Sequence, residues 1–170
     1  MEPSIREHRD EFEQTVRAYG ADLYRYAYWL SRDRFTAEEL VQEVFARAWA
    51  SWSELRDIKF VKQWLITILR NERSRMFARK TIPMSDDDVQ ELEIAQTSSV
   101  AEDFDTRRRI ERLPLSFREP LLLQVLGGYS CAEIAAMLDT SEGAVMTRLT
   151  RARQLVRGDE TAPPLLRVAT

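Results

Sequence analysis

Hydrophobic positions recur at steps of three or four along most of the chain, a spacing that predicts helices. The first such series runs through Phe12, Val16, Tyr19, Leu23, Ala27 and Leu30. Gly20 falls inside it and is expected to divide it into two helical pieces. The N-terminal portion shows none of the two-residue alternation of a half-buried strand, so the pattern predicts an all-α fold.

A second helix is predicted from Thr36 to Trp49 or slightly beyond, because Thr36-Ala-Glu-Glu39 matches a capping box. One side of this helix is apolar. The other side carries Glu39, Gln42, Glu43, Ala46 and Ala50. Short alanines beside acidic and amide groups would form a flat acidic surface on which another helix could lie closely. The pattern fits a solvated face with helix-favouring alanines equally well.

Residues 53–59 are expected to form a loop, followed by a helix over Phe60–Leu69 that is apolar on nearly all sides. That helix should be the centre of its domain, and its extension over 70–80 is basic. Five aromatic side chains near these basic groups could stack on unpaired bases, namely Trp49, Trp52, Phe60, Trp64 and Phe77. Core packing is the commoner role of aromatic residues, and we favour it for each of them singly.

Towards the C-terminus, the stretch from Ser130 to Arg153 predicts two short helices joined by a turn, a helix-turn-helix. Ser130 can cap the first helix, with Glu133 completing a capping box. The turn comprises residues 139–141, and Ser141 can cap the second helix.

The second of these helices has two different sides. Its apolar stripe consists of Val145, Leu149, Ala152 and Val156. The opposite side and its edges carry Gly143, Thr147, Arg148, Thr150, Arg151, Arg153, Gln154 and Arg157. Such a surface suits the major groove of DNA, where Thr and Arg can meet base edges while flanking arginines hold phosphates. A solvated face on an ordinary amphipathic hairpin is the alternative.

Breaks between these patterns divide the chain. Pro83 ends the first part. In the second part, 99–102 and 116–119 begin two helices, and Gly127-Gly128 ends the later one. We predict a helical domain over residues 1–83, a flexible acidic linker over 84–105, a helix-turn-helix domain over 106–158 and a disordered tail over 159–170.

Charge is distributed unevenly over these parts. The chain as a whole has a net charge of -3, but residues 84–105 hold eight acidic side chains and no Lys or Arg, which leaves +5 for the rest. The basic side chains gather at 70–80 and at 148–157. Two basic patches flanking an acidic connector favour nucleic acid as a partner, although basic groups also complement a helix C-terminus.

Several function classes are disfavoured. No apolar run is long enough to span a membrane and the first residues are too polar for a secretory signal, so a cytoplasmic protein without membrane insertion is expected. Cys131 and His8 are the only residues of their kinds, which excludes an intramolecular disulfide and disfavours a Cys/His metal site. The chain shows no phosphate loop, nucleophile elbow or catalytic triad. We therefore expect neither an enzyme nor a cofactor.

Four segments together resemble a known family. They are Thr36-Ala-Glu-Glu-Leu-Val-Gln-Glu-Val-Phe-Ala-Arg-Ala-Trp49, Trp64-Leu-Ile-Thr-Ile-Leu-Arg-Asn71, Leu113-Pro-Leu-Ser-Phe-Arg-Glu119 and Gly143-Ala-Val-Met-Thr-Arg-Leu-Thr-Arg-Ala-Arg153. Their order and spacing, with the acidic connector, resemble the extracytoplasmic-function sigma factors of bacterial RNA polymerase over nearly all of residues 10–157. The two domains correspond to sigma regions 2 and 4.

The resemblance implies partners for the first domain. The helix matching Thr36–Trp49 would dock on the β′ clamp helices of core RNA polymerase, through Glu39, Gln42, Glu43 and Ala46. The loop matching Ser53–Phe60 would capture a flipped base of the promoter −10 element. The side chains implied in −10 binding are Trp64, Asn71, Arg73 and Arg75.

The resemblance also implies that the second domain, which would contact the polymerase β subunit, reads the −35 element as duplex DNA. Thr147, Thr150 and Arg151 would meet bases or nearby backbone, and Arg148 and Arg153 would hold phosphates. Two positions depart from the family. Met146 stands where Lys or Arg is common, which suggests a different −35 preference, and Asp139 stands where the turn often has Gly, a change that Asp tolerates.

These implications describe a sigma factor that binds core RNA polymerase, directs transcription initiation and is controlled by an anti-sigma factor, which could also hold it at the membrane. Two alternatives remain open. One is a free-standing helix-turn-helix regulator that binds an operator without polymerase. The other is a sigma-like adaptor that only sequesters an anti-sigma factor.

Overall fold

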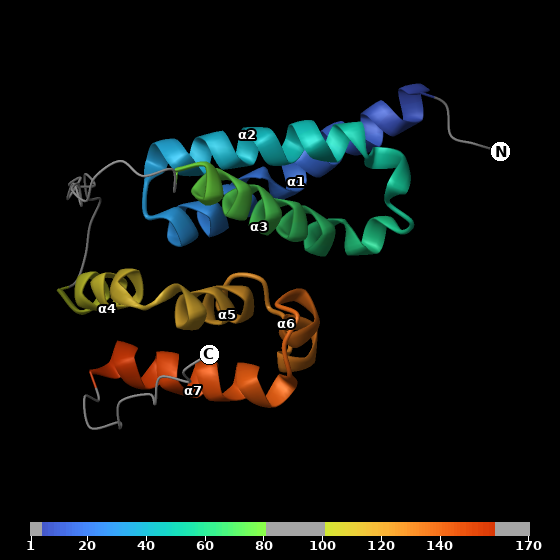
Figure 1. The fold of residues 1–170 in the computed structure, drawn as a ribbon. Helices are drawn as coiled ribbons and strands as arrows, with labels where there is room; N and C mark the ends of the chain where they lie inside the picture. Colours follow the sequence, from blue (N-terminus) through green and yellow to red (C-terminus); the bar gives the residue numbers. More distant parts are fainter. Residues whose placement is uncertain (1–4, 81–100, 159–170) are drawn as a thin grey trace. The chain divides into compact units, whose positions relative to one another are not determined.

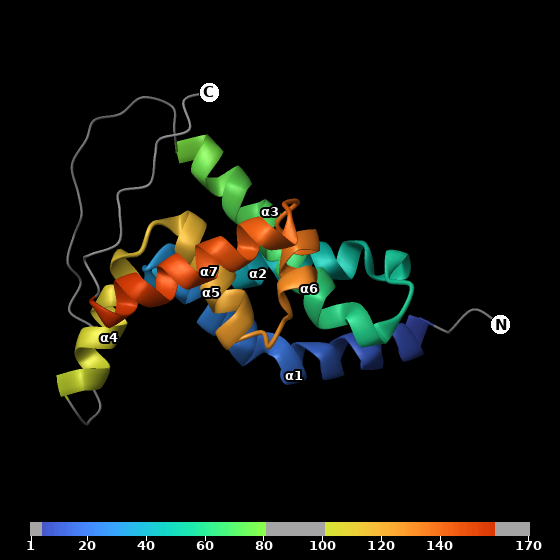
Figure 2. The same cartoon turned by 90° about the horizontal axis from the view of Figure 1, so that it is seen from below.

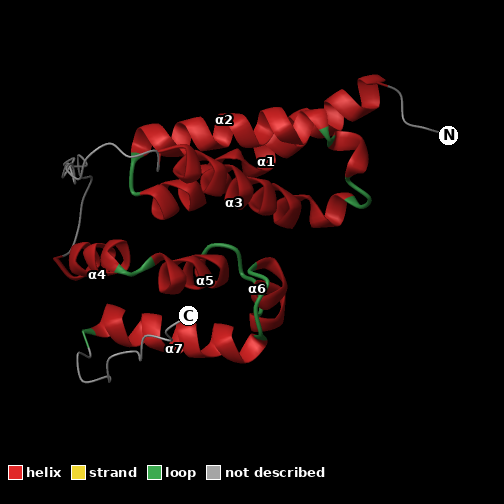
Figure 3. Ribbon diagram, viewed as in Figure 1, coloured by secondary structure: helices red, strands yellow, loops and turns green. Residues whose placement is uncertain are grey.

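Helices make up all of the regular structure in the computed structural model, which describes residues 5–80 and 101–158 (Figure 3). Since these residues include no strand, the all-α prediction is confirmed. The chain divides into two compact units, Met1–Ala95 and Gln96–Thr170, and each is described by itself. Most of the predicted acidic linker and the whole predicted tail lie outside the described residues.

The first unit contains α1 (Ile5–Ser31), α2 (Arg34–Ala50) and α3 (Val61–Lys80), which pack against one another (Figure 1). Two short 3-10 turns, η1 (Trp52–Glu54) and η2 (Ile58–Phe60), connect α2 to α3, where the sequence predicted a loop. The core between the three helices is formed by Leu23, Ala27, Leu30, Ala37, Leu40, Val44, Ala48, Val61, Leu65, Ile66 and Leu69. The apolar part of α3 contributes Val61, Leu65, Ile66 and Leu69 to this core, but α2 packs more extensively against the other two helices, so the prediction that α3 is the centre of the domain is wrong.

Helix α1 is continuous through Gly20, so the predicted division into two pieces is wrong. A single glycine inside a helix costs only about 1 kcal/mol relative to alanine, and packing can offset that cost. The position of Gly20 faces Phe45 of α2, and a Cβ placed there would lie 4.0 Å from the phenyl ring. The contact between α1 and α2 therefore continues across the glycine.

The start of α2 also differs from the prediction. Asp33 is the N-cap residue, and its carboxylate accepts a hydrogen bond of 2.7 Å from the Thr36 backbone N–H. Thr36 is thus the third helical residue and not the cap, and the capping box assigned to Thr36 and Glu39 is wrong. Asp33 occupies this place because α1 ends at Ser31 and Arg32 reverses the chain with a φ of 59°.

The second unit contains α4 (Ala101–Arg112), α5 (Leu115–Val125), α6 (Cys131–Met137) and α7 (Glu142–Arg157), as Figure 2 shows from a second side. Helix α7 packs against the other three. Their shared core includes Leu113, Phe117, Leu121, Leu122, Leu123, Ile134, Val145, Leu149 and Ala152. Because α4 begins at Ala101, the last residues of the predicted acidic linker are helical.

Helix α5 begins one residue before the predicted Ser116 and has no side-chain cap. Pro114 occupies the N-cap position, and its carbonyl accepts from the backbone N–H groups of Phe117 and Arg118 at 3.0 and 2.9 Å. The predicted end of this helix is confirmed. Gly128 adopts a left-handed φ of 71°, and its N–H donates to the Gln124 carbonyl.

Candidate nucleic-acid interface

Helices α6 and α7 form the predicted helix-turn-helix. The Ser130 hydroxyl accepts from the Glu133 backbone N–H at 3.3 Å, and the Glu133 carboxylate accepts from the Ser130 N–H at 2.8 Å, so the capping box is confirmed. The turn passes through Asp139 with a φ of 50°, a left-handed conformation that Asp tolerates. Ser141 then caps α7 by accepting from the Ala144 N–H at 3.1 Å.

The capping box predicts a lowered pKa for the Glu133 carboxyl. Hydrogen bonds from the Ser130 N–H and then its hydroxyl hold the pKa of Glu133 below the ordinary 4.5. A carboxyl whose pKa is lower in the folded state stabilises the fold at pH values above its pKa in the unfolded state. This contribution is lost as the pH falls through its pKa in the folded state. We expect carboxyl NMR to find a Glu133 midpoint below 4.5. Ser130→Ala keeps only the backbone donor, so the Glu133 midpoint should rise part of the way towards the ordinary value. Identical Glu133 midpoints in the unmodified chain and in Ser130→Ala would contradict the role of the Ser130 hydroxyl.

The exposed side of α7 carries the residues that the sequence assigns to the −35 element. Val145, Leu149 and Ala152 are buried, while Thr147, Thr150 and Arg153 are exposed. Arg148 and Arg151 are half-buried at the edge of this surface. The Arg153 guanidinium donates to the Gln124 side-chain carbonyl of α5. The structure therefore brings all five predicted residues to one exposed side of the helix-turn-helix and its margins.

The predicted polymerase-binding residues share one exposed side of α2. Glu39, Gln42, Glu43 and Ala46 are all exposed. Leu40 and Val44, on the opposite side of the helix, are completely buried. The surface is acidic, and the short Ala46 side chain leaves room beside the carboxylates for another helix to approach.

On α3, the structure brings three of the four residues predicted for −10 binding to one face. Trp64, Asn71 and Arg75 fall within about 40° of one another around the helix axis, whereas Arg73 lies on the opposite side. Asn71 and Arg75 are exposed, and Trp64 is half-buried, with its ring centroid 6.1 Å from that of Trp52. The Arg73 guanidinium lies 4.5 Å from the centre of the Phe77 ring.

Aromatic residues near the basic block divide between core and surface. Trp52 is 7% exposed, so the core role expected for it is confirmed. Phe60, Trp49 and Phe77 are 59%, 45% and 40% exposed, so the same expectation is wrong for them. They lie at helix ends and in the 3-10 turns, where the three-helix core does not extend over them. These three side chains are accessible to a partner.

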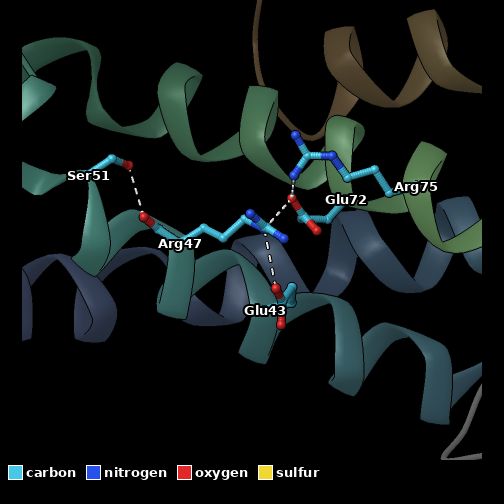
Figure 4. A network of polar contacts seen from close by, with 5 residues as sticks. All are labelled: Glu43, Arg47, Ser51, Glu72 and Arg75. Atoms are coloured by element: carbon cyan, nitrogen blue, oxygen red, sulfur yellow. Dashed lines mark hydrogen bonds and ion pairs between the residues drawn. The ribbon is translucent and has the colours of Figure 1, made fainter.

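An ionic network that the sequence analysis missed connects α2 to α3 (Figure 4). Arg47 Nε lies 3.2 Å from a Glu43 carboxylate oxygen and 2.5 Å from one of Glu72. Arg75 Nη1 lies 2.7 Å from the same Glu72 oxygen. The Glu72 side chain is only 7% exposed. The sequence does indicate that Glu72 is buried, because Glu72 continues the apolar stripe of Leu65 and Leu69 at helical spacing.

A second missed residue is Arg118, which is 4% exposed inside the C-terminal unit. Its guanidinium donates to the backbone carbonyls of Glu111 and Leu113 at 2.9 and 3.1 Å, at the end of α4. Arg118 therefore joins α5 to the C-terminus of α4. The sequence offers no local signal for this role, because a single arginine inside an apolar helix also fits a solvated position.

Among the described residues, no group of three or more His, Cys, Asp or Glu side chains is placed to hold a metal ion. Within the same residues, no helix has the length and apolar character needed to cross a membrane.

Family models match both units of the chain in the expected order. The model of sigma-70 region 2 matches residues 15–81, which span α2 and α3 and most of α1. The model of sigma-70 region 4 matches residues 104–156, which include the helix-turn-helix.

Individual proteins are similar over most of the chain. The ECF RNA polymerase sigma factor SigM of Mycobacterium tuberculosis is 30% identical over 149 residues, covering 85% of this chain and 74% of that protein. The probable RNA polymerase sigma factor RfaY of Xanthomonas campestris is 31% identical over 76% of this chain, which spans only 35% of that relative. The sigma factor RpoE of Bartonella quintana, solved in complex with the anti-sigma factor NepR, has a TM-score of 0.72 and 28% identity. That match covers 90% of this chain and 98% of RpoE.

Proposed function

Because this chain belongs to the extracytoplasmic-function sigma factors of RNA polymerase, we propose that it docks on core polymerase through α2 and binds the −10 and −35 promoter elements through α3 and α7. The observation that carries this proposal is the joint exposure of the three surfaces. Each lies opposite a buried apolar stripe within the segment that matches a sigma region.

The α2 surface of Glu39, Gln42, Glu43 and Ala46 is the proposed polymerase contact. Its carboxylates suit a basic helical partner, and the small Ala46 side chain allows close approach. The Glu43 carboxylate is held by Arg47, which is in turn held by Glu72 of α3. This arrangement fixes the orientation of Glu43 before the partner arrives.

The proposed −10 site lies along α3. Asn71 is exposed and carries an amide, which can both donate to and accept from a base edge. Trp64 on the same face offers a ring against which a flipped base could stack, and exposed Phe60 lies just before this helix. Arg75 supplies positive charge beside Asn71. Arg73, whose guanidinium lies over the Phe77 ring on the opposite side of α3, is proposed to contact the DNA backbone outside this face.

The proposed −35 site is the exposed side of α7. Thr147, Thr150 and Arg151 are assigned to bases or nearby backbone, and Arg148 and Arg153 to phosphates. The Gln124 side chain steadies Arg153 from α5. The isolated chain is net acidic, so it should bind DNA weakly, and polymerase would make its two promoter contacts cooperative.

A protein inhibitor is the third proposed partner. The similar RpoE of Bartonella quintana was solved in complex with the anti-sigma factor NepR. On this chain, the exposed apolar groups beside the α2 surface, such as Trp49, offer contacts for such a protein. We place the chain in the cytoplasm with the polymerase, assign it no catalytic activity, and allow that a membrane-bound inhibitor could tether it.

In vitro transcription with purified core polymerase tests the function as a whole. We expect promoter-specific transcripts only when this chain is added. Tight operator binding by the chain alone, without stimulation of polymerase, would instead indicate a free-standing regulator. Anti-sigma binding without any transcription would indicate an adaptor.

Charge reversal at Glu43 tests the α2 surface. Glu43→Lys should weaken binding to core polymerase about tenfold, because a lysine would face a basic partner. Competition of labelled chain for core polymerase gives the affinity. Glu38→Lys is the matched control, since the Glu38 and Glu43 side chains are 46% and 47% exposed and each pairs with an arginine four residues away. Equal affinities of the two variants would contradict the proposed surface.

A further inference from the structure

Met146 is a large apolar side chain exposed on the surface of α7 that we assign to DNA. It is 56% exposed, although the neighbouring helix side buries Val145 and Leu149 almost completely. At helical spacing it lies beside Thr150, one turn later, and on the same side as Gly143, one turn earlier. The described residues of the C-terminal unit leave more than half of this side chain exposed, so an apolar group is presented where the helix would enter the groove.

The two threonines of this surface use their hydroxyl protons inside the helix. The Thr147 hydroxyl donates to the Gly143 carbonyl at 3.0 Å, and the Thr150 hydroxyl donates to the Met146 carbonyl at 2.9 Å. A hydroxyl has a single proton, so neither side chain can donate to a base without breaking its bond to the helix. The γ-methyl groups, together with hydroxyl lone pairs, remain available for contact with DNA.

Gly143 leaves room for a close approach. A Cβ placed on Gly143 would meet no atom within 4 Å, so this part of the surface is open. Around it, the arginines lie at the margins of the surface, with Arg148 and Arg151 on one side and Arg153 on the other. The middle of the surface therefore holds Gly143, the two threonines and Gln154. Met146 lies towards the Arg153 margin, and the rim is cationic.

We propose that α7 reads thymine methyl groups in the −35 element, with Met146 as the specificity-determining residue and Thr147 and Thr150 as methyl-bearing neighbours. This inference rests on the proposed function of α7. Thymine is the base that carries a methyl group in the major groove, and apolar side chains recognise it by contact. The cationic rim would hold the flanking phosphates, which carry no sequence information.

Uracil in place of thymine tests the proposal, because it pairs identically and lacks only the C5 methyl. A promoter is first selected with the polymerase–chain complex from DNA duplexes randomised over both elements. Each thymine of its −35 element, on either strand, is then replaced by uracil, and transcription is measured. A buried methyl is worth about 0.8 kcal/mol, so we expect about a fourfold loss at one or more positions.

Protein variants identify the residue that makes the contact. Met146→Ala should lower transcription from the thymine promoter about fourfold and show less than a twofold further loss with uracil at that position. Met146→Leu, which keeps an apolar side chain, should retain the uracil effect. Val125→Ala is the control, because Val125 is an apolar side chain 69% exposed on α5, outside this surface. It should keep the full uracil effect.

The inference is overturned if no uracil substitution lowers transcription, if Met146→Ala keeps the full uracil loss at every position, or if the selected element contains no A·T pair. Failure of the proposed function looks different. In that case, replacing the whole −35 sequence leaves transcription by the complex unchanged. Loss of transcription on that replacement, without a methyl effect, overturns only the inference about Met146.

Discussion

Replacing Arg118 with alanine should lower the free energy of unfolding of the C-terminal unit by about 3 kcal/mol. The guanidinium is 4% exposed and donates to the carbonyls of Glu111 and Leu113. Alanine would leave these carbonyls without that donor and would open a cavity between α4 and α5. Arg118→Lys should lose less, because an ammonium keeps the charge and has three donors, and both carbonyls accept from the single nitrogen Nη1 in arginine.

Amide hydrogen exchange on the full chain locates this effect. A loss of about 3 kcal/mol corresponds to roughly a hundredfold faster exchange in the most protected amides of α5 and α7, and those of α1 to α3 should not change. Arg112→Ala is the control, since Arg112 is exposed on the last turn of α4 and should cost less than about 0.5 kcal/mol. If the two variants exchange alike, Arg118 does not hold α4 to α5.

Removing the Glu72 carboxylate should be the most costly single change in the ionic network of the first unit. Glu72→Ala should lower its free energy of unfolding by about 2 kcal/mol, because Arg47 and Arg75 would face each other without the buried carboxylate between them. This figure lies below the usual cost of breaking a buried pair, since the two arginine side chains are 43% and 55% exposed. Glu72→Gln should cost about half as much, because it keeps the shape of the side chain and one hydrogen bond.

Tryptophan fluorescence reports this change selectively, since all four tryptophans, residues 29, 49, 52 and 64, lie in the first unit. The urea midpoint of the fluorescence transition should fall in Glu72→Ala with an unchanged slope. Glu13→Ala, which removes an exposed partner of Arg9, should shift it by less than about 0.5 kcal/mol. A Glu72→Ala midpoint equal to that of Glu13→Ala would mean that the network contributes no stability.

Features that depend on residues three or four apart were predicted well. The capping box of Ser130 and Glu133 and the cap at Ser141 join groups three residues apart, so the sequence contains the whole interaction. The apolar stripe of α7 is equally local. The start of α2 was misplaced because Asp33 and Thr36 are both good caps, and the choice between them depends on where α1 ends and how Arg32 turns the chain.

Features that depend on distant partners could not be predicted in this way. Trp49 and Trp52 are three residues apart and chemically identical, yet one is 45% exposed and the other 7%. Phe12 packs against both rings, whereas Trp64 of α3 packs against Trp52, which accounts for part of this difference. Among the proposed −10 residues, Arg75 pairs with Glu72 three residues away on the same helix, and this local pair was missed. Only the second partner of that carboxylate, Arg47 of α2, depends on the packing of α2 against α3.

The sequence by itself therefore determined the positions of most helices, the helix-turn-helix and the solvent-facing sides of α2 and α7, because helical periodicity and caps involve near neighbours. Only the tertiary structure decided which aromatic side chains are buried, that Glu72 and Arg118 hold helices together, and that Met146 remains 56% exposed on α7. These outcomes depend on atoms brought together from separate helices and on the rotamers that packing selects, and no local pattern in the chain contains that information.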